Sequence, residues 1–510
     1  MFSLLISIAY AQDITISKSE IDRAFGYRSA MKLFEGSLFS ASDTIFKTSE
    51  TQIYSRLSKF QGATFTATLV NGVYHGRLIK PNVVYYELKK TSATNYSLVK
   101  KEAKDIISEL SKKSFPDENF DDAGTPMSEE EFKTTAARLR EINSQIPQDN
   151  DLELVTTYGW GCVYLAMQGY NVNSSMWNYG TPFYATPVSF ANNADSINLV
   201  VARLKTFLYP FSVVVTTDEN VYNATQVDKR ITTIITRTNF YGAGTLGISY
   251  VTSFTWGDNT PNFVFQTSVN ATNFNYLIET LKHESGHPFG LYHQSKYDST
   301  TCVLQQAYNA GFGTGELSWA PMMGTPINAT RVHTWNTGPT PNGCNFKQDN
   351  LSIIINSNGI GYRYEVAPTN NPTLNISSFP DSARGQGAGE KSISQPNFIT
   401  IGNDSASYKI VIYKTGPSTI TATPSGDMGA SGNFPLMRLK SRLYNEAHQV
   451  VASSDDNINS TSAIISQAIP PGTYYLIVSK YRLPESVYPG FYNGRDPYYG
   501  LYGWFYITQD

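Results

Sequence analysis

Residues 283–293 read His283-Glu284-Ser285-Gly286-His287-Pro288-Phe289-Gly290-Leu291-Tyr292-His293, which is the pattern His-Glu-x-x-His-x-x-Gly-x-x-His without a substitution. The chain holds 6 histidines in 510 residues, and three of them occur in this stretch at fixed spacing. Chance is a poor explanation for such a grouping. The stretch therefore indicates a metal site.

The spacing of these residues suits a catalytic zinc ion. Residues four apart on an α-helix share one face, so His283 and His287 can direct their imidazoles at one ion. Gly290 accepts a positive φ and ends the helix abruptly, which lets the chain turn back with His293 as a third ligand. A catalytic zinc takes three protein ligands and keeps one position for water. Glu284, beside the first ligand, is placed to take a proton from that water.

The residues before this stretch predict the helix that carries it. Apolar residues recur there at helical spacing, and Thr272 or Asn273 can cap the helix; the apolar positions are Phe274, Leu277, Ile278 and Leu281. At about 100° per residue this stripe lies opposite the histidine face. One side of the helix is thus expected to pack on a core while the other holds the metal.

The length and composition of the chain limit the classes of protein to which it can belong. A chain of 510 residues suggests about three domains. The net charge of −3 offers no basic field for nucleic acid. Abundant tyrosine and phenylalanine, with only 16% charged residues, favour β-rich secreted domains. No run approaches the roughly 18 apolar residues of a membrane span.

The N-terminal third is expected to precede the catalytic region. Residues 1–11 end in Ala9-Tyr10-Ala11 after an apolar run, as in a secretory signal peptide, although an apolar strand is the alternative. Residues 12–115 form a β-rich pro-region, with a hairpin of 63–70 and 73–79 joined by an Asn-Gly turn.

A charged linker with a helix is predicted over residues 116–151. Ser128 and Glu131 form a capping box for that helix, which runs to about Ile146. The basic pairs Lys100-Lys101 and Lys112-Lys113 are candidate processing sites, and a solvated charge run is the alternative.

Residues 152–365 show the alternation of an α/β catalytic domain. The predicted elements are a strand at 162–167, a helix at 196–204, and strands at 211–216, 231–236, 247–251 and 263–265. A linker over 366–372 then leads to residues 373–510, where short strands separated by Gly, Pro and Asn turns predict a β-sandwich of jelly-roll type.

The three cysteines leave one without a partner. Cys302 and Cys344 flank Met322 and Met323 and are the preferred disulfide. Cys162 starts a predicted strand, where a buried free thiol is expected.

These features together resemble the metzincin metallopeptidases, in particular the reprolysin-like branch and secreted microbial relatives with a C-terminal β-sandwich. The resemblance spans roughly 155–365. It rests on the histidine motif and on Ala320-Pro321-Met322-Met323-Gly324, which is similar to the family's methionine turn and places Met323 beneath the zinc. Without the family, both methionines would be interpreted as core filler.

The resemblance implies a catalytic domain with a mixed, twisted sheet and an active-site helix. It implies that substrate lies extended along an edge strand made of Gly247, Ile248, Ser249, Tyr250 and Val251. Gly290 and Met323 would support the metal site, and Cys162 is an alternative candidate for the family's latency thiol. A structural Ca²⁺ is compatible with the family, but no residue is assigned to it.

Three positions depart from the family pattern. Pro288 follows the second ligand and removes a backbone donor, so a local kink is expected. Gln294 follows the third ligand where several branches carry an acid, and Thr325 stands where two branches place a tyrosine ligand. Three histidines and water are therefore the expected ligands.

The sequence thus predicts a secreted zinc metalloendopeptidase that acts on proteins or peptides through zinc-bound water, with Glu284 as general base. The alternative is a zinc-binding adhesin or carbohydrate-binding surface protein with residual or no peptidase activity. Its glycan contact would come from the aromatic tail between Tyr488 and Tyr506.

Overall fold

The structure is a computed structural model in which a defined set of residues is described. These are residues 14–26, 31–32, 36, 38–40, 43–49, 52–57, 63–70, 72–80, 84–101, 107–111, 150–242, 244–266, 274–312, 319–325, 332–357, 360–363, 375–378, 392–393, 397–399, 405–412, 416–424, 437–454, 460–481 and 503–509. They form a mixed α+β architecture with several sheets and few helices. No helix among them is long and apolar enough to cross a membrane.

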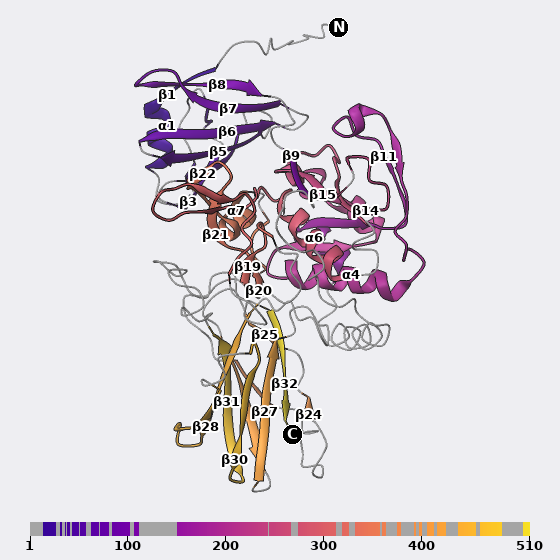
Figure 1. Cartoon of the computed structure of the whole chain (residues 1–510), viewed down its shortest axis with the longest axis vertical. Helices are drawn as coiled ribbons and strands as arrows, with labels where there is room; N and C mark the ends of the chain where they lie inside the picture. The colour runs from indigo at the N-terminus through magenta and orange to yellow at the C-terminus, as the bar shows by residue number, and fades with distance from the viewer. Residues whose placement is uncertain are drawn as a thin grey trace.

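The N-terminal residues form an eight-stranded antiparallel sheet in the order β1-β8-β7-β6-β5-β4-β3-β2 (Figure 1). Its strands are β1 (Ile14–Ser17), β2 (Met31–Lys32), β3 (Thr44–Ser49), β4 (Gln52–Leu57), β5 (Ala63–Val70), β6 (Val73–Lys80), β7 (Val84–Lys90) and β8 (Asn95–Lys101). The hairpin of β5 and β6 is confirmed, since Val70 pairs with Val73 and Gly72 has a φ of 74°. Helix α1 (Lys18–Phe25) packs on this sheet through Ile21 and Ala24.

A six-stranded sheet lies in the part of the chain that contains the histidine motif. Its strand order is β13-β10-β14-β16-β15-β9. Parallel strands make up its first four positions: β13 (Val213–Thr216), β10 (Gly161–Ala166), β14 (Arg230–Thr236) and β16 (Asn262–Phe265). β15 (Thr245–Tyr250) is antiparallel to β16, and β9 (Ile107–Ser111) is antiparallel to β15. The strands predicted from residues 162 to 265 therefore exist, most within two residues of their predicted ends.

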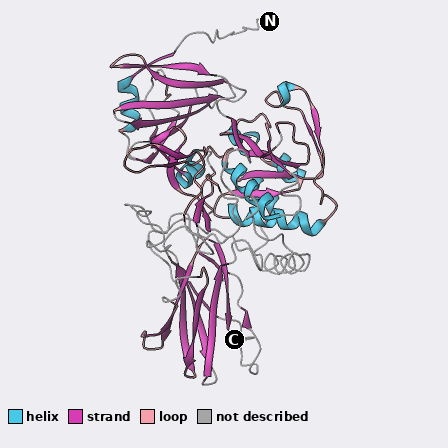
Figure 2. Cartoon of the chain, viewed as in Figure 1, coloured by secondary structure: helices cyan, strands magenta, loops and turns pink. Residues whose placement is uncertain are grey.

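Helices cover both faces of this sheet, and Figure 2 shows them gathered in this part of the chain. Helices α4 (Ala194–Leu208) and α6 (Phe274–Gly286) share one core with the inward residues of β14 and β16. The other face is covered by α3 (Asp151–Thr156), α5 (Glu219–Ala224) and the hairpin of β11 (Tyr170–Val172) and β12 (Phe183–Ala185). Strand residues alternate between the two cores, as Ile235 and Ile234 of β14 do.

The chain after α6 builds a smaller unit beneath the N-terminal sheet (Figure 1). It contains β17 (Lys296–Tyr297), β18 (Leu304–Gln306), β19 (Trp319–Pro321), β20 (Val332–Thr334), β21 (Thr337–Thr340), β22 (Gly343–Asp349) and α7 (Asn350–Ser357). α7 contacts β3 and β4, and β22 contacts β5. The N-terminal sheet therefore packs on the unit that follows the histidine motif.

The C-terminal residues form two five-stranded sheets with a shared apolar core. One has the order β23-β26-β31-β28-β29, and the other has β24-β32-β27-β30 with β25 paired to β32. Their bounds are β23 (Asn375–Ser378), β24 (Ser392–Ile393), β25 (Asn397–Ile399), β26 (Ser405–Ile412), β27 (Gly416–Pro424), β28 (Leu439–Asn445), β29 (Val450–Ser453), β30 (Ala463–Ile469), β31 (Gly472–Lys480) and β32 (Gly503–Gln509).

Three findings depart from the expectations. Helix α6 ends at Gly286, earlier than the expected end at Gly290, and a turn spans 287–290 because Pro288 cannot continue the helix. β9, assigned to the pro-region, joins the sheet of the catalytic region. Lys100 and Lys101 lie in β8 and pair with β7, so this basic pair is not in a linker.

Other predictions lie outside the described residues. They are the signal peptide at 1–11, the linker with its helix over 116–149, the N-cap at Thr272 or Asn273, the linker at 366–372 and the aromatic tail over 488–502.

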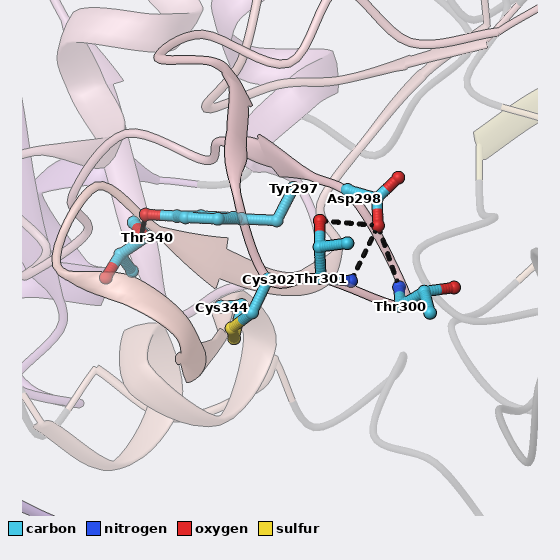
Figure 3. Close-up of a disulfide and its surroundings, with 7 residues drawn as sticks. All are labelled: Tyr297, Asp298, Thr300, Thr301, Cys302, Thr340 and Cys344. Carbon is cyan, nitrogen blue, oxygen red and sulfur yellow. Dashed lines mark hydrogen bonds between the residues drawn. A yellow bond between two sulfur atoms is a disulfide. The ribbon is translucent and has the colours of Figure 1, made fainter.

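The cysteines pair as predicted. A disulfide joins Cys302 to Cys344, with a Cα–Cα distance of 5.7 Å (Figure 3). It connects the segment between β17 and β18 to the start of β22. Beside it, the Asp298 carboxylate accepts hydrogen bonds from Thr301, and Tyr297 donates to the Thr340 carbonyl. Cys162 is a buried free thiol on β10, and burial raises its pKa to about 12.

Candidate metal site

Three histidines converge as the sequence predicts. The side chains of His283, His287 and His293 offer nitrogen atoms that all lie within 4.8 Å of one another. Their ring centroids are separated by 4.9 Å, 5.1 Å and 4.8 Å for the pairs 283–287, 283–293 and 287–293. His283 projects from the last turn of α6, His287 is the first residue of the turn at 287–290, and His293 follows that turn.

Hydrogen bonds on the far side of two rings fix their orientation. His283 Nδ1 lies 2.8 Å from the Met322 carbonyl oxygen, and His287 Nδ1 lies 2.7 Å from the Leu291 carbonyl oxygen. A carbonyl only accepts, so both Nδ1 atoms carry the proton and donate it. Both Nε2 atoms are left as bases, and they are buried without a hydrogen-bond partner among the described residues. Two such nitrogens that lie close to the ring of His293 form a donor set that fits a metal ion, because a buried basic nitrogen needs a partner and neutral imidazole is a common metal ligand.

Burial keeps the imidazoles neutral. It lowers the pKa of His283 to about 4, although the bond to the Met322 carbonyl works in the opposite direction. Burial also holds the pKa values of His287 and His293 well below the usual range, and the neighbouring imidazoles add to this effect. Neutral imidazole is the form that ligates a metal.

Glu284 lies beside the histidines and faces the sheet. It is fully buried, and its Oε2 accepts a hydrogen bond of 2.6 Å from the Ser249 hydroxyl on β15. Gly247, two residues earlier on the same face of β15, leaves room for this carboxylate. A Cβ at position 247 would lie 2.6 Å from Glu284 Cδ, which no side chain can occupy.

The turn after α6 and the methionine turn support the third ligand. Gly290 has a φ of 99°, and its amide donates to the His287 carbonyl at 2.8 Å, as expected for a glycine after a helix. The Gln294 amide, next to His293, donates to the Met323 carbonyl at 2.6 Å. Met323 is buried against α6, where a Cβ at Gly286 would lie 2.5 Å from its Sδ.

A buried ionic cluster that the sequence did not reveal joins α6 to β20. Glu279 accepts from Lys282 Nζ at 2.7 Å and from His333 Nδ1 at 2.6 Å, and all three side chains are at most 1% exposed. Burial opposes ionisation of Glu279, but the charges of Lys282 and His333 outweigh it and hold its pKa well below the usual range. His333 is therefore a structural partner of α6 and lies outside the three-histidine cluster. The sequence feature that could have indicated this cluster is the pair Glu279 and Lys282, two charged residues three positions apart just before the motif.

The predicted substrate edge is β15, and it is not the outermost strand. β9 pairs with it throughout, with Leu110 opposite Gly247, Glu109 opposite Ile248 and Ser108 opposite Ser249. Strand pairing connects residues that are far apart in sequence. The local sequence of β9 therefore did not predict that this strand pairs with β15.

Comparison with protein families agrees with this geometry. Residues 188–294 match the model of the reprolysin-like metallopeptidases of family M12B. The match ends just past His293 and includes the whole histidine motif. This part of the chain is therefore similar to the reprolysin-like metallopeptidases, which confirms the resemblance to metzincins. No curated protein matches the chain.

Two solved structures are similar to parts of the chain at 13% identity and a TM-score of 0.17 each. One is the pre-peptidase C-terminal domain of collagenase from Bacillus anthracis, and the match covers 28% of this chain and 99% of that one. The other is PliG, a periplasmic inhibitor of g-type lysozyme from Aeromonas hydrophila, and the match covers 27% of this chain and 98% of that one.

Replacing the third histidine tests the metal site. His293→Ala should release its metal to a chelator at least about tenfold faster than the parent, because a three-ligand site becomes a two-ligand site. Metal content after timed exposure to EDTA measures this loss. His75→Ala, which removes an exposed histidine that is not part of the three-histidine cluster, is the control. Equal retention in His293→Ala and the parent would show that another residue completes the site.

Proposed function

We propose that this protein is a secreted zinc metalloendopeptidase. The observation that carries the proposal is the pair of partnerless Nε2 atoms of His283 and His287, directed with His293 at one point beside the buried Glu284 carboxylate. The match to reprolysin-like metallopeptidases supports peptide bonds as the target. The disulfide supports an oxidising compartment outside the cytosol.

Three neutral imidazoles favour zinc and would leave a fourth position for substrate or water. A zinc ion bound there supplies a Lewis acid that polarises the scissile carbonyl and makes water more acidic. Glu284 takes the proton from the attacking water and delivers it to the leaving amine. Ser249 donates to one oxygen of this carboxylate and so fixes its direction.

The backbone of β15 is the proposed binding edge for substrate. An extended peptide could add to it as an antiparallel strand, and main-chain hydrogen bonds would then hold the scissile bond beside Glu284. Gly247 brings that backbone against the carboxylate, since no side chain separates the two.

The same edge supports a role for the N-terminal segment as an inhibitory pro-region. β9 lies where an added substrate strand would pair, so it occupies the proposed binding edge. The N-terminal sheet also docks near the third ligand: the Arg77 guanidinium lies 4.8 Å from the ring centroid of Tyr292 and donates to Asn342 at 2.8 Å. Cys162 is buried among Val155, Val214 and Val221, which places its thiol in a different core from the histidines. We therefore assign latency to the blocked edge and not to a cysteine.

Carbohydrate binding by the C-terminal residues gains no support from the described part of the tail. Phe505 and Ile507 of β32 are buried in the shared core of the two sheets. We assign these sheets as a β-sandwich domain.

Removal of the general base tests the reaction. Glu284→Gln should bind zinc as the parent does, because the three histidines remain. Its hydrolysis of a peptide should fall by roughly 10²–10⁴-fold, the usual contribution of a general base. The measurement is kcat/KM together with zinc content on the same sample. Activity above about a hundredth of the parent would contradict the assignment of Glu284.

Breaking β9 tests latency. Amide groups alternate sides along a strand, so one of two consecutive residues must donate to β15. Glu109→Pro/Leu110→Pro should therefore remove a ladder bond and raise the peptidase activity of the uncleaved chain at least about tenfold. Glu109→Val/Leu110→Val keeps both amides and is the control.

A chain nicked between residues 112 and 149 should gain activity to a similar degree. A peptide of residues 105–113 should then inhibit it in competition with substrate, while a scrambled peptide should not. Equal rates for intact, proline-substituted and nicked forms would show that the N-terminal segment is simply another domain.

A further inference from the structure

The carbonyl oxygen of Glu284 lacks its usual donor. In an α-helix each carbonyl accepts from the amide four residues later. Residue 288 is proline and has no amide hydrogen, so the Glu284 carbonyl cannot accept the helical hydrogen bond from the amide four residues later. Glu284 is fully buried, which makes a carbonyl without a donor costly. The departure at Pro288 therefore requires a donor from elsewhere.

Side chains of the sheet supply that donor. Asn262 Nδ2 on β16 donates to the Glu284 carbonyl at 3.2 Å, and Ser249 Oγ lies 3.2 Å from the same oxygen. The serine hydroxyl lies closer to Glu284 Oε2, at 2.6 Å, so its single hydrogen goes to the carboxylate. Asn262 therefore serves the backbone of Glu284, while Ser249 serves its side chain.

These residues form one row across three adjacent strands. Thr233 on β14 pairs with Asn262, and its hydroxyl donates to Asn262 Oδ1 at 2.7 Å. This bond fixes the amide of Asn262 with its NH₂ group toward α6. Strands β15 and β16 pair Gly247 with Val264 and Ile248 with Phe263, and the next step of this register places Ser249 beside Asn262. All three polar side chains are fully buried.

Burying this row of polar side chains costs free energy, so we expect the row to have a role. Its neighbours on the same face of the sheet are apolar: Ile235 and Val264 belong to the core that packs beneath α6. Three buried polar groups in such a core lose hydration and gain nothing in packing. Their hydrogen bonds lead to one residue, Glu284, through its carbonyl and its carboxylate.

We infer that Thr233, Asn262 and Ser249 form a positioning row for Glu284. Asn262 replaces the backbone donor that Pro288 removes, and Ser249 fixes the direction of the carboxylate. The row acts through Glu284, so these are positioning residues. The role of Ser249 in catalysis rests on the proposed peptidase function, whereas the replacement of the missing donor by Asn262 does not.

Hydrogen exchange tests the Asn262 contribution without reference to activity. In the full-length protein, Asn262→Ala should make the amides of residues 281–287 exchange about tenfold faster or more, because the last turn of α6 loses a buried hydrogen bond. Pro288→Ala provides an amide four residues after Glu284. The double variant Asn262→Ala/Pro288→Ala should then return to within about threefold of the parent rate.

Asn350→Ala removes a buried amide on α7, whose Oδ1 accepts from the Asn336 amide, and is the matched control for this exchange experiment. It should leave residues 281–287 at the parent rate. An unchanged rate in Asn262→Ala, or a double variant as fast as Asn262→Ala, would overturn the replacement of the donor.

Kinetics test the Ser249 contribution. Ser249→Ala should lower kcat about tenfold, with KM within about twofold of the parent and zinc content unchanged, because a hydrogen bond to a buried charged group is lost. Ser253→Ala removes a buried hydroxyl that has no partner among the described residues, and it should keep the parent kcat. A parent-like kcat in Ser249→Ala, or a rise in KM alone, would overturn this assignment. A parent protein without peptidase activity would contradict the proposed function, while the exchange experiment would still decide the role of Asn262.

Discussion

The hydrogen bond from His283 to the Met322 carbonyl is the contact on which the rest of the site depends. It joins α6 to the turn around Met322 and sets which nitrogen of His283 is directed at the proposed metal position. One hydrogen bond contributes only about 1 kcal/mol, so the turn needs further support. The Met322 amide donates to the Thr334 carbonyl at 2.9 Å, and the neighbouring His333 bonds to Glu279 on the same helix. Helix α6 is thus connected to the turn through His283 and to the adjacent strand β20 through Glu279, at two points about one helical turn apart.

The sheet restrains the opposite side of the helix. His283 is oriented by the methionine turn, whereas Glu284 is held by residues of β15 and β16. His283 and Glu284, the proposed metal ligand and base, are adjacent in sequence but receive their orientation from different parts of the fold. This separation explains why a helix with an apolar stripe of Leu277, Ile278 and Leu281 can still bury a carboxylate and two imidazoles.

The sequence predicted what depends on local spacing. The three-histidine cluster, the positive φ of Gly290 and the apolar stripe of α6 follow from helical periodicity and glycine stereochemistry, and the structure contains them. The end of α6 was misplaced because Pro288 was expected only to kink the last turn. Contacts between distant segments were not predictable in this way. The pairing of β9 with β15 and the alignment of Asn262 with Ser249 depend on strand register, which no short stretch of sequence encodes.

A single zinc ion held by three imidazoles is the proposed centre of this site, and X-ray absorption at the zinc edge tests it most directly. The purified full-length protein should contain one zinc per chain, with three imidazole nitrogens and one further light atom as neighbours. Loss of one imidazole from the spectrum of His293→Ala would assign the third ligand. A sulfur neighbour would contradict the account, because it would bring Cys162 to the metal from the core in which the structure buries it. A spectrum with fewer than three imidazoles in the parent would contradict it equally.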